Sequence, residues 1–380
     1  MNSSRLYDYI IAGAGCSGLS LAIHLIESER FADKKILLID KDIKKANDRT
    51  WCFWQKEEGL FEPIIYKQWQ RLRFHGEDHS SLLHLQPYHY KMIRGIDFYE
   101  YCLQIINRQT NVDILFDTVE SVFSEEKTGV VVKGERIYSD YVFNSILFDK
   151  PVLRSNEYWL LQHFLGWTIE TDEDCFDAEV ATLMDFRVSQ LNGAAFCYVL
   201  PVTSRKALIE YTLFSSQLLQ RDEYERAVEG YIKEHLNLSS YQINEKEFGV
   251  IPMTNHKFPT RQNNIVNIGT AGGQTKGSSG YTFNFIQKHS KAIVESLIAT
   301  GKPFLSSEPR RFNFYDGILL KVLSDGIVPG NKIFTDLFRK NAVQKVFRFL
   351  DNETNLAEEV KIISTLPTLP FLKAGIRHLL

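Results

Sequence analysis

Long apolar runs are missing from this 380-residue chain, in which no stretch approaches the roughly 20 residues that span a bilayer. No apolar signal segment precedes the first predicted strand, so we expect a cytoplasmic protein with only peripheral membrane contact. The five cysteines are odd in number, widely spaced and free of any CxxC pair, which argues against a disulfide framework and a zinc site. We predict no metal. The basic residues form no stripe and the formal net charge is -3, which argues against nucleic acid as a partner.

Aromatic residues, by contrast, are abundant, with 26 Phe and 17 Tyr among the 380 residues. Several lie in loop-like stretches, where a large apolar or polyene ligand would suit them. For any single aromatic residue, an ordinary place in the core is the favoured interpretation.

The clearest motif lies near the N-terminus, where an apolar run ends at Ala12 and passes into the sequence GAGCSG, residues 13–18. Gly13 permits a tight turn, Gly15 lets the backbone approach a pyrophosphate, and Gly18 lets the next helix pack close to the strand. The helix N-terminus then favours the negative charge of the phosphates.

A second apolar strand follows at residues 35–39 and ends at Asp40, whose carboxylate is placed to accept hydrogen bonds from ribose hydroxyls. The order of strand, turn, helix, strand and acid predicts a dinucleotide site at Ala12, Gly13, Ala14, Gly15, Gly18 and Asp40. A glycine-rich turn without nucleotide is the alternative.

The order of predicted strands and helices along the chain predicts an α/β protein in which one domain interrupts another. We expect a Rossmann-like nucleotide-binding domain at residues 1–150 and 248–310, interrupted by an antiparallel β-sheet substrate domain at 151–247. Residues 311–380 are predicted to form a helical C-terminal region. A second strand and glycine-rich loop return the chain to the first domain and add Gly269, Gly272, Gly280 and Tyr281 to the candidate cofactor site.

Several short blocks occur in the same order as in one known family. They are RTWCFW (49–54), LQHFLGW (161–167), LMD (183–185), YVLP (198–201), ALIE (207–210), GVIPM (249–253) and GYTF (280–283). Together with the N-terminal motif, these blocks resemble the flavoprotein-type lycopene cyclases, which form the β-ionone rings of carotenoids. The resemblance implies an FAD-binding domain of the glutathione-reductase or hydroxylase type, bound FAD, and lycopene or related acyclic carotenoids as substrates.

The resemblance also implies a non-redox cyclisation, which begins when an acid protonates the terminal double bond of lycopene. A carboxylic acid in an apolar tunnel stays protonated because burial disfavours its charged form. We identify Glu210 as the candidate acid, although its strand pattern alone fits an outward-facing residue. Many family members carry paired carboxylates in this block, whereas Tyr211 follows Glu210 here. Asp185 is the second candidate, to stabilise the cation, position Glu210 or receive the ring proton.

Aromatic faces stabilise carbocations without trapping them. We therefore expect Trp51, Phe53, Trp54 and Trp167 to line the substrate, although each is also compatible with the core. Reduced FAD, with NADPH as its reductant, would add an electrostatic contribution. Arg94 precedes a helix and fits either a flavin contact or a surface charge.

Two other functions share these features. A flavin monooxygenase or isoprenoid reductase would carry the same glycine motifs, and a non-catalytic carotenoid-binding flavoprotein would bind both molecules without converting them. Since lycopene dissolves in lipid, we expect peripheral contact with the inner face of the cell membrane through apolar side chains of residues 334–350.

Overall fold

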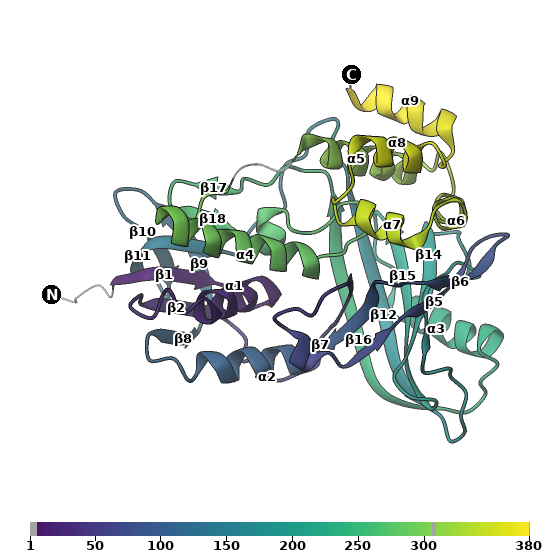
Figure 1. The fold of residues 1–380 in the computed structure, drawn as a ribbon, viewed down its shortest axis with the longest axis horizontal. Coiled ribbons are helices and arrows are strands. Elements are labelled where there is room, and N and C mark those ends of the chain that lie inside the picture. The colour runs from purple at the N-terminus through teal and green to yellow at the C-terminus, as the bar shows by residue number, and fades with distance from the viewer. Residues whose placement is uncertain (1–5, 306–308, 380) are drawn as a thin grey trace.

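The computed structural model describes residues 6–305 and 309–379 (Figure 1). Residues 1–5, 306–308 and 380 fall inside the expected units but lie outside the described residues. Two β-sheet units stand side by side, with the nucleotide-type unit on the left of Figure 1, a large curved sheet on the right, and the C-terminal helices above that sheet.

The first unit is built on parallel strands around β1 (Leu6–Ala12), which pairs with β2 on one side and β11 on the other. All its strands pair in one eight-stranded sheet: β1, β2 (Ile36–Asp40), β8 (Val112–Phe116), β9 (Val119–Ser124), β10 (Thr128–Val132), β11 (Glu135–Asn144), β17 (Arg261–Gln262) and β18 (Ile265–Asn267). The burial of every residue of β2 explains its continuous apolar sequence.

The helices α1 (Cys16–Glu27), α2 (Gly95–Ile106) and α4 (Phe283–Thr300) belong to this unit (Figure 1). Helix α1 packs on both α2 and α4, and apolar residues of all three share one core cluster with Ile11 of β1. The expected strand, turn and helix at the N-terminus are therefore present, with Gly15 as the N-cap of α1.

The second unit is a seven-stranded sheet in the order β16-β12-β15-β14-β13-β5-β6. Its strands are β5 (Arg71–His75), β6 (Ser80–His84), β12 (Trp159–Glu170), β13 (Val180–Asp185), β14 (Ala194–Pro201), β15 (Lys206–Ser215) and β16 (Gln242–Thr254). A small three-stranded sheet pairs with no strand of the larger one but shares its apolar core, and consists of β3 (Thr50–Gln55), β4 (Lys67–Trp69) and β7 (His89–Arg94).

Side chains alternate between the two faces of the seven-stranded sheet, and helices cover both faces. One face packs against α3 (Arg221–His235), with Leu165, Ile209 and Leu213 in a shared apolar cluster. The other face packs against the C-terminal helices, above the sheet in Figure 1. These helices are α5 (Arg310–Ser324), α6 (Gly330–Lys340), α7 (Val343–Leu350), α8 (Leu356–Ile363) and α9 (Thr368–Leu379).

Strand pairing shifts two of the expected boundaries. Strands β5 and β6 come from the segment 1–150 but extend the second sheet, since β5 pairs in parallel with β13. Strand β16 crosses the expected boundary at residue 248 and pairs with β12 along its length. Both pairings join segments that are distant in the chain, which no local pattern reveals.

The predicted membrane-contacting tail at residues 334–350 is wrong in its location. Its apolar side chains are buried, and Phe334 stacks on Phe186 of the segment after β13 with ring centroids 5.7 Å apart. Phe338 packs on Phe74 of β5 with tilted rings, whose centroids are 4.8 Å apart. The amphipathic pattern of α6 and α7 therefore marks the face that covers the sheet, not a free surface.

Candidate functional site

The glycine turn after β1 has the geometry that the sequence predicts. Gly13 adopts a φ of +96°, which favours glycine, and a Cβ on Gly18 would lie 1.9 Å from the Gly13 carbonyl oxygen. A Cβ on Gly15, by contrast, would meet no atom within 4 Å beyond its chain neighbours. The first turn of α1 contains no acidic residue, and its N-cap makes no side-chain hydrogen bond. The first N–H groups of α1 have no partner within the helix, and the space beside Gly15 is open.

Asp40 connects the second strand to this turn. One carboxylate oxygen accepts a hydrogen bond from the Ala14 backbone N–H at 2.6 Å, and the other lies 3.2 Å from the Lys44 ammonium. Asp40 therefore fixes the turn directly, while its contact with a ribose stays a prediction. Ala12, at the end of β1, is fully buried beneath the turn.

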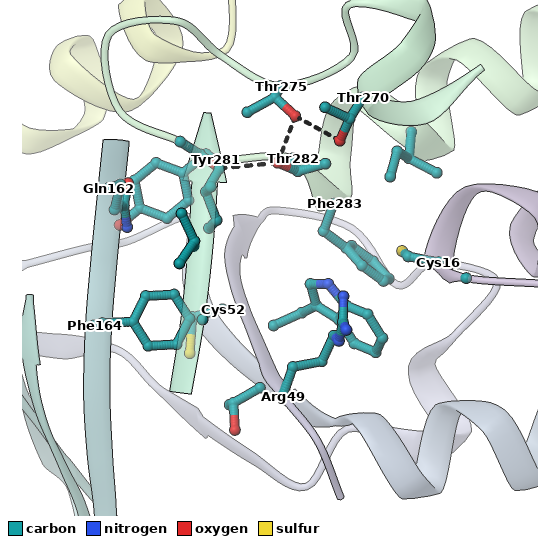
Figure 2. Close-up of a pocket in the computed structure, with 18 of the residues that line it drawn as sticks. Cys16, Arg49, Cys52, Gln162, Phe164, Thr270, Thr275, Tyr281, Thr282 and Phe283 are labelled. Atoms are coloured by element: carbon teal, nitrogen blue, oxygen red, sulfur yellow. Dashed lines mark hydrogen bonds between the residues drawn. The ribbon is translucent and has the colours of Figure 1, made fainter. Parts of the chain in front are cut away.

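A cavity of about 570 Å³ lies between the two units, and Gly15 opens into it. Figure 2 shows Gln162 and Phe164 projecting from β12 on one side, with Cys16, Arg49 and Phe283 on the other. Tyr281 and a chain of hydroxyl contacts through Thr270, Thr275 and Thr282 close the upper side in this view. The cavity therefore joins the glycine turn to the second sheet.

Two buried polar atoms beside the cavity are available for hydrogen bonds to a ligand. Gln162 Oε1 and Ser279 Oγ are buried and have no hydrogen-bond partner among the residues that the structure describes. Gly280, with a φ of +71°, leaves room for Gln162, because a Cβ there would lie 2.1 Å from Gln162 Oε1. Such unpaired buried groups are costly unless another molecule satisfies them.

The late glycine loop contributes only in part to the cavity wall. Gly269, Gly280 and Tyr281 line it, as expected, and burial raises the pKa of Tyr281 to about 12. Gly272 has a packing role instead, since a Cβ there would lie 2.3 Å from the Asn267 carbonyl oxygen.

Glu210 of β15 faces the cavity, as we predicted from the family resemblance. Thr212 donates a hydrogen bond to its Oε1 at 2.7 Å. Burial raises the pKa of Glu210 well above its usual value, and the nearby carboxyl of Glu247 adds to the effect. Both effects favour the protonated form of this carboxyl group.

Glu247 of β16 is a second carboxyl group that the sequence analysis missed. Gly166 of β12 pairs with Glu210 on one side and with Glu247 on the other, so all three occupy one face of the sheet. A Cβ on Gly166 would come within 3.0 Å of the Glu247 side chain, so glycine at this position leaves the space between the strands open. Tyr211, which replaces the second acid of the family block, packs on the α3 side.

Asp185 is not brought to the cavity. Its carboxylate is fully buried and accepts hydrogen bonds from the Arg187 guanidinium at 2.6 to 3.2 Å and from the Tyr231 hydroxyl at 2.8 Å. Burial alone would raise the pKa of Asp185, but the hydrogen bonds from Arg187 outweigh it and lower that pKa. Asp185 is therefore a paired anion beneath α3 and lies outside the cavity lining where a catalytic role was expected.

Arg94 is also placed away from the cavity lining. Its guanidinium makes two hydrogen bonds of 2.7 Å to Asp97 and lies over the Tyr66 ring. The arginine that does line the cavity is Arg49, at the start of the RTWCFW block. Its position beside the aromatic block was visible in the sequence, but no spacing rule distinguished it from Arg94.

Of the four aromatic residues expected to line the substrate, Trp51 lines the cavity. Phe53 and Trp54 border a neighbouring cavity of about 760 Å³, and Trp54 contacts Tyr281 edge-on at 4.5 Å. Trp167 packs in the α3 cluster on the opposite face, because its neighbour Gly166 takes the cavity side of β12. Apolar residues that the analysis did not single out complete the wall: Phe164, Leu200, Leu208, Ile251 and Pro252.

Within residues 6–305 and 309–379, no group of three or more His, Cys, Asp or Glu side chains is placed to hold a metal ion. No helix there has both the length and the apolar character to cross a membrane.

Solved structures define the class to which this fold belongs. A geranylgeranyl bacteriochlorophyll reductase-like protein of Thermoplasma acidophilum matches with a TM-score of 0.66 and 13% identity, covering 97% of this chain and 98% of that one. A flavoprotein/dehydrogenase of Cytophaga hutchinsonii gives a TM-score of 0.64 and 12% identity, covering 95% and 99%. The fold is that of FAD-dependent monooxygenase- and reductase-type flavoproteins, which confirms the predicted fold class.

Sequence comparison gives the family. The model described as lycopene cyclase protein matches residues 8–375, so the chain belongs to the lycopene cyclase family. A chloroplastic neoxanthin synthase of Solanum tuberosum is 27% identical over 323 residues, covering 78% of this chain and 62% of that protein. A lycopene beta-cyclase of Pantoea ananas is 26% identical over 218 residues, covering 54% and 52%. The chain thus spans less than two thirds of the length of either relative.

Proposed function

We propose that this protein is a lycopene β-cyclase, which converts the acyclic ends of lycopene to β-ionone rings and gives γ- and β-carotene without net redox change. The proposal rests on the observation that Gly15 and Glu210 line the same cavity. A nucleotide-type turn and a buried carboxylic acid therefore open into one cavity.

FAD is the cofactor that this site would hold. The open backbone at Gly15 and the uncapped N-terminus of α1 suit its pyrophosphate. Arg49 and the unpaired Gln162 Oε1 supply a positive charge and an acceptor farther along the cavity. When bound in its reduced, anionic form, with NADPH as the reductant, the flavin would supply negative charge near a cationic ring intermediate.

The chain's own residues would carry the proton chemistry. Glu210 donates its proton to the terminal double bond, the neighbouring double bond attacks the resulting cation, and a ring proton then leaves. One proton is added and one is lost, so the product is an isomer of the substrate. The apolar wall excludes water, which would otherwise trap the cation, and Trp51 and Tyr281 present ring faces suited to positive charge.

A flavin oxidoreductase is the competing function, because the solved neighbours of this fold include a reductase-like protein and a flavin-dependent halogenase. We would express the chain in lycopene-producing cells and separate the carotenoids by chromatography. Appearance of γ- and β-carotene supports the proposal. Unchanged lycopene, or a product of altered hydrogen or oxygen content, would reject it.

Because lycopene dissolves in lipid, we expect the protein to act at a membrane surface. Exposed apolar side chains gather on the last two helices: Leu356, Val360, Leu369, Leu372 and Ile376. On α9, three of them recur at spacings of three and four residues and so share one face. We propose that this α8–α9 face touches the cytoplasmic surface of the cell membrane, from which lycopene enters the protein.

A further inference from the structure

Two buried carboxyl groups, those of Glu210 and Glu247, lie on either side of Gly166. Glu210 belongs to β15 and Glu247 to β16, and β12 separates these strands. Since both residues pair with Gly166, only a residue without a side chain stands between them. Two carboxylates this close repel each other when both are ionised, so the pair holds a proton more readily than either group alone.

The surroundings of the pair distribute that proton unequally. Thr50 of β3 donates a hydrogen bond of 2.9 Å to Glu247 Oε2, which favours the ionised form of Glu247. The Glu247 side chain is 8% exposed and lies behind the cavity wall, while Glu210 opens into the cavity. Thr212 gives Glu210 a similar hydrogen bond, and burial raises the pKa of both carboxyl groups. The contact between them, however, raises the pKa of Glu210 further and lowers that of Glu247, so the shared proton is favoured on Glu210, on the cavity side of the pair.

Other titratable groups also lie near the pair. Cys52 of β3, Tyr198 of β14 and Tyr281 lie near Glu210, and burial raises the pKa of each, so they are neutral. On the far side, the carboxylates of Asp48 and Glu245 raise the pKa of Glu247, but each accepts a hydrogen bond of its own, from Tyr99 and Asn47 respectively.

We propose that Glu247 is a positioning residue: it shares one proton with Glu210 across Gly166, and the charge it carries keeps that proton on Glu210 until substrate arrives. This inference rests on the proposed function for its catalytic meaning. After Glu210 gives its proton to the double bond, two adjacent carboxylates face each other. Their repulsion favours the return of one proton, which balances the proton that the ring loses.

The test is the pH dependence of turnover in a matched series of variants. Glu247→Gln keeps the shape but removes the charge, so the pH above which turnover fails should fall by at least about one unit. Glu247→Asp keeps the charge and should stay near the wild-type profile. Glu234→Gln removes a charge from the exposed surface of α3, on the opposite side of the sheet, and should leave the profile unchanged. A Glu247→Gln enzyme with reduced turnover but an unmoved pH limit would overturn the proposal.

A second measurement separates this inference from the cyclase assignment. Infrared titration of the carotenoid-free protein follows the C=O stretch of protonated carboxyl groups and needs no activity. We expect a band that persists at neutral pH, disappears in Glu210→Gln, and titrates at lower pH in Glu247→Gln. If the band behaves in this way but lycopene is not cyclised, the proton pair stands and the proposed function fails. If cyclisation occurs and the band does not respond to Glu247→Gln, the pair is rejected.

Discussion

At the scale of single residues, the function depends on how the environment of each carboxyl group decides its charge. Burial and the neighbouring Glu247 carboxyl group favour the protonated form of Glu210 and outweigh the hydrogen bond from Thr212. Asp185 has a guanidinium and a phenol beside it, so it is ionised. Both acids lie in apolar strands and look alike in the sequence. Partners from other strands and helices distinguish them, and those partners are set by tertiary structure.

Replacement of the acid should abolish chemistry and leave binding intact. Glu210→Gln preserves shape and most hydrogen bonding but removes the proton, so ring formation should fall by at least about 100-fold while flavin content stays near that of the wild type. Flavin absorbance and chromatography of carotenoids from the same preparation measure both quantities. Cyclisation close to the wild-type rate would exclude Glu210 as the acid.

Asp185→Asn should affect stability instead of chemistry. The ionised, paired carboxylate stabilises the fold at pH values above the usual aspartate pKa of about 3.9, and this contribution is lost as the pH falls through the lowered pKa of the folded state. We expect the variant to lose about 1–3 kcal/mol at pH 7, and less than that at pH 3. Chemical unfolding at both pH values checks this, and an equal loss at both would contradict the ion-pair account.

At the scale of elements, the local motifs were predictable and the pairing between distant strands was not. Strand β1, its turn and α1 are contiguous, so spacing alone identified them. The position of Glu247 depends on the register of β16 against β12, segments about 80 residues apart. Trp167 lies on the α3 face of β12 and not at the cavity, and its sequence block gives no indication of which residues face the cavity.

The turn before α1 can be tested without disturbing the protein around it. Gly15→Val places its side chain in open space, so the fold should survive while flavin binding is lost. Gly230→Ala in α3 is the matched control, because a Cβ there also meets no atom within 4 Å and the position is remote from the cavity. Circular dichroism and bound-flavin absorbance give the readout. A folded Gly15→Val protein with full flavin content would show that the cofactor binds elsewhere.

At the scale of the whole molecule, the C-terminal helices have two different surfaces. The inner faces of α6 and α7 cover the large sheet, while α8 and α9 leave apolar side chains exposed. We expect the protein to float with liposomes, and Leu369→Asp combined with Leu372→Asp to weaken flotation several-fold. Leu191→Asp, at a position that is 93% exposed outside these helices, is the control. Equal flotation of all three proteins would exclude the α8–α9 face.

The central claim is that one cavity joins a flavin site to a proton donor for a reaction without net redox change. The most direct test incubates the purified protein with reduced flavin and lycopene in deuterated water. We predict one deuterium per ring, at the carbon next to the gem-dimethyl carbon, with no stoichiometric consumption of NADPH. Oxidation of one NADPH per product, or rings without deuterium at that carbon, would contradict the account.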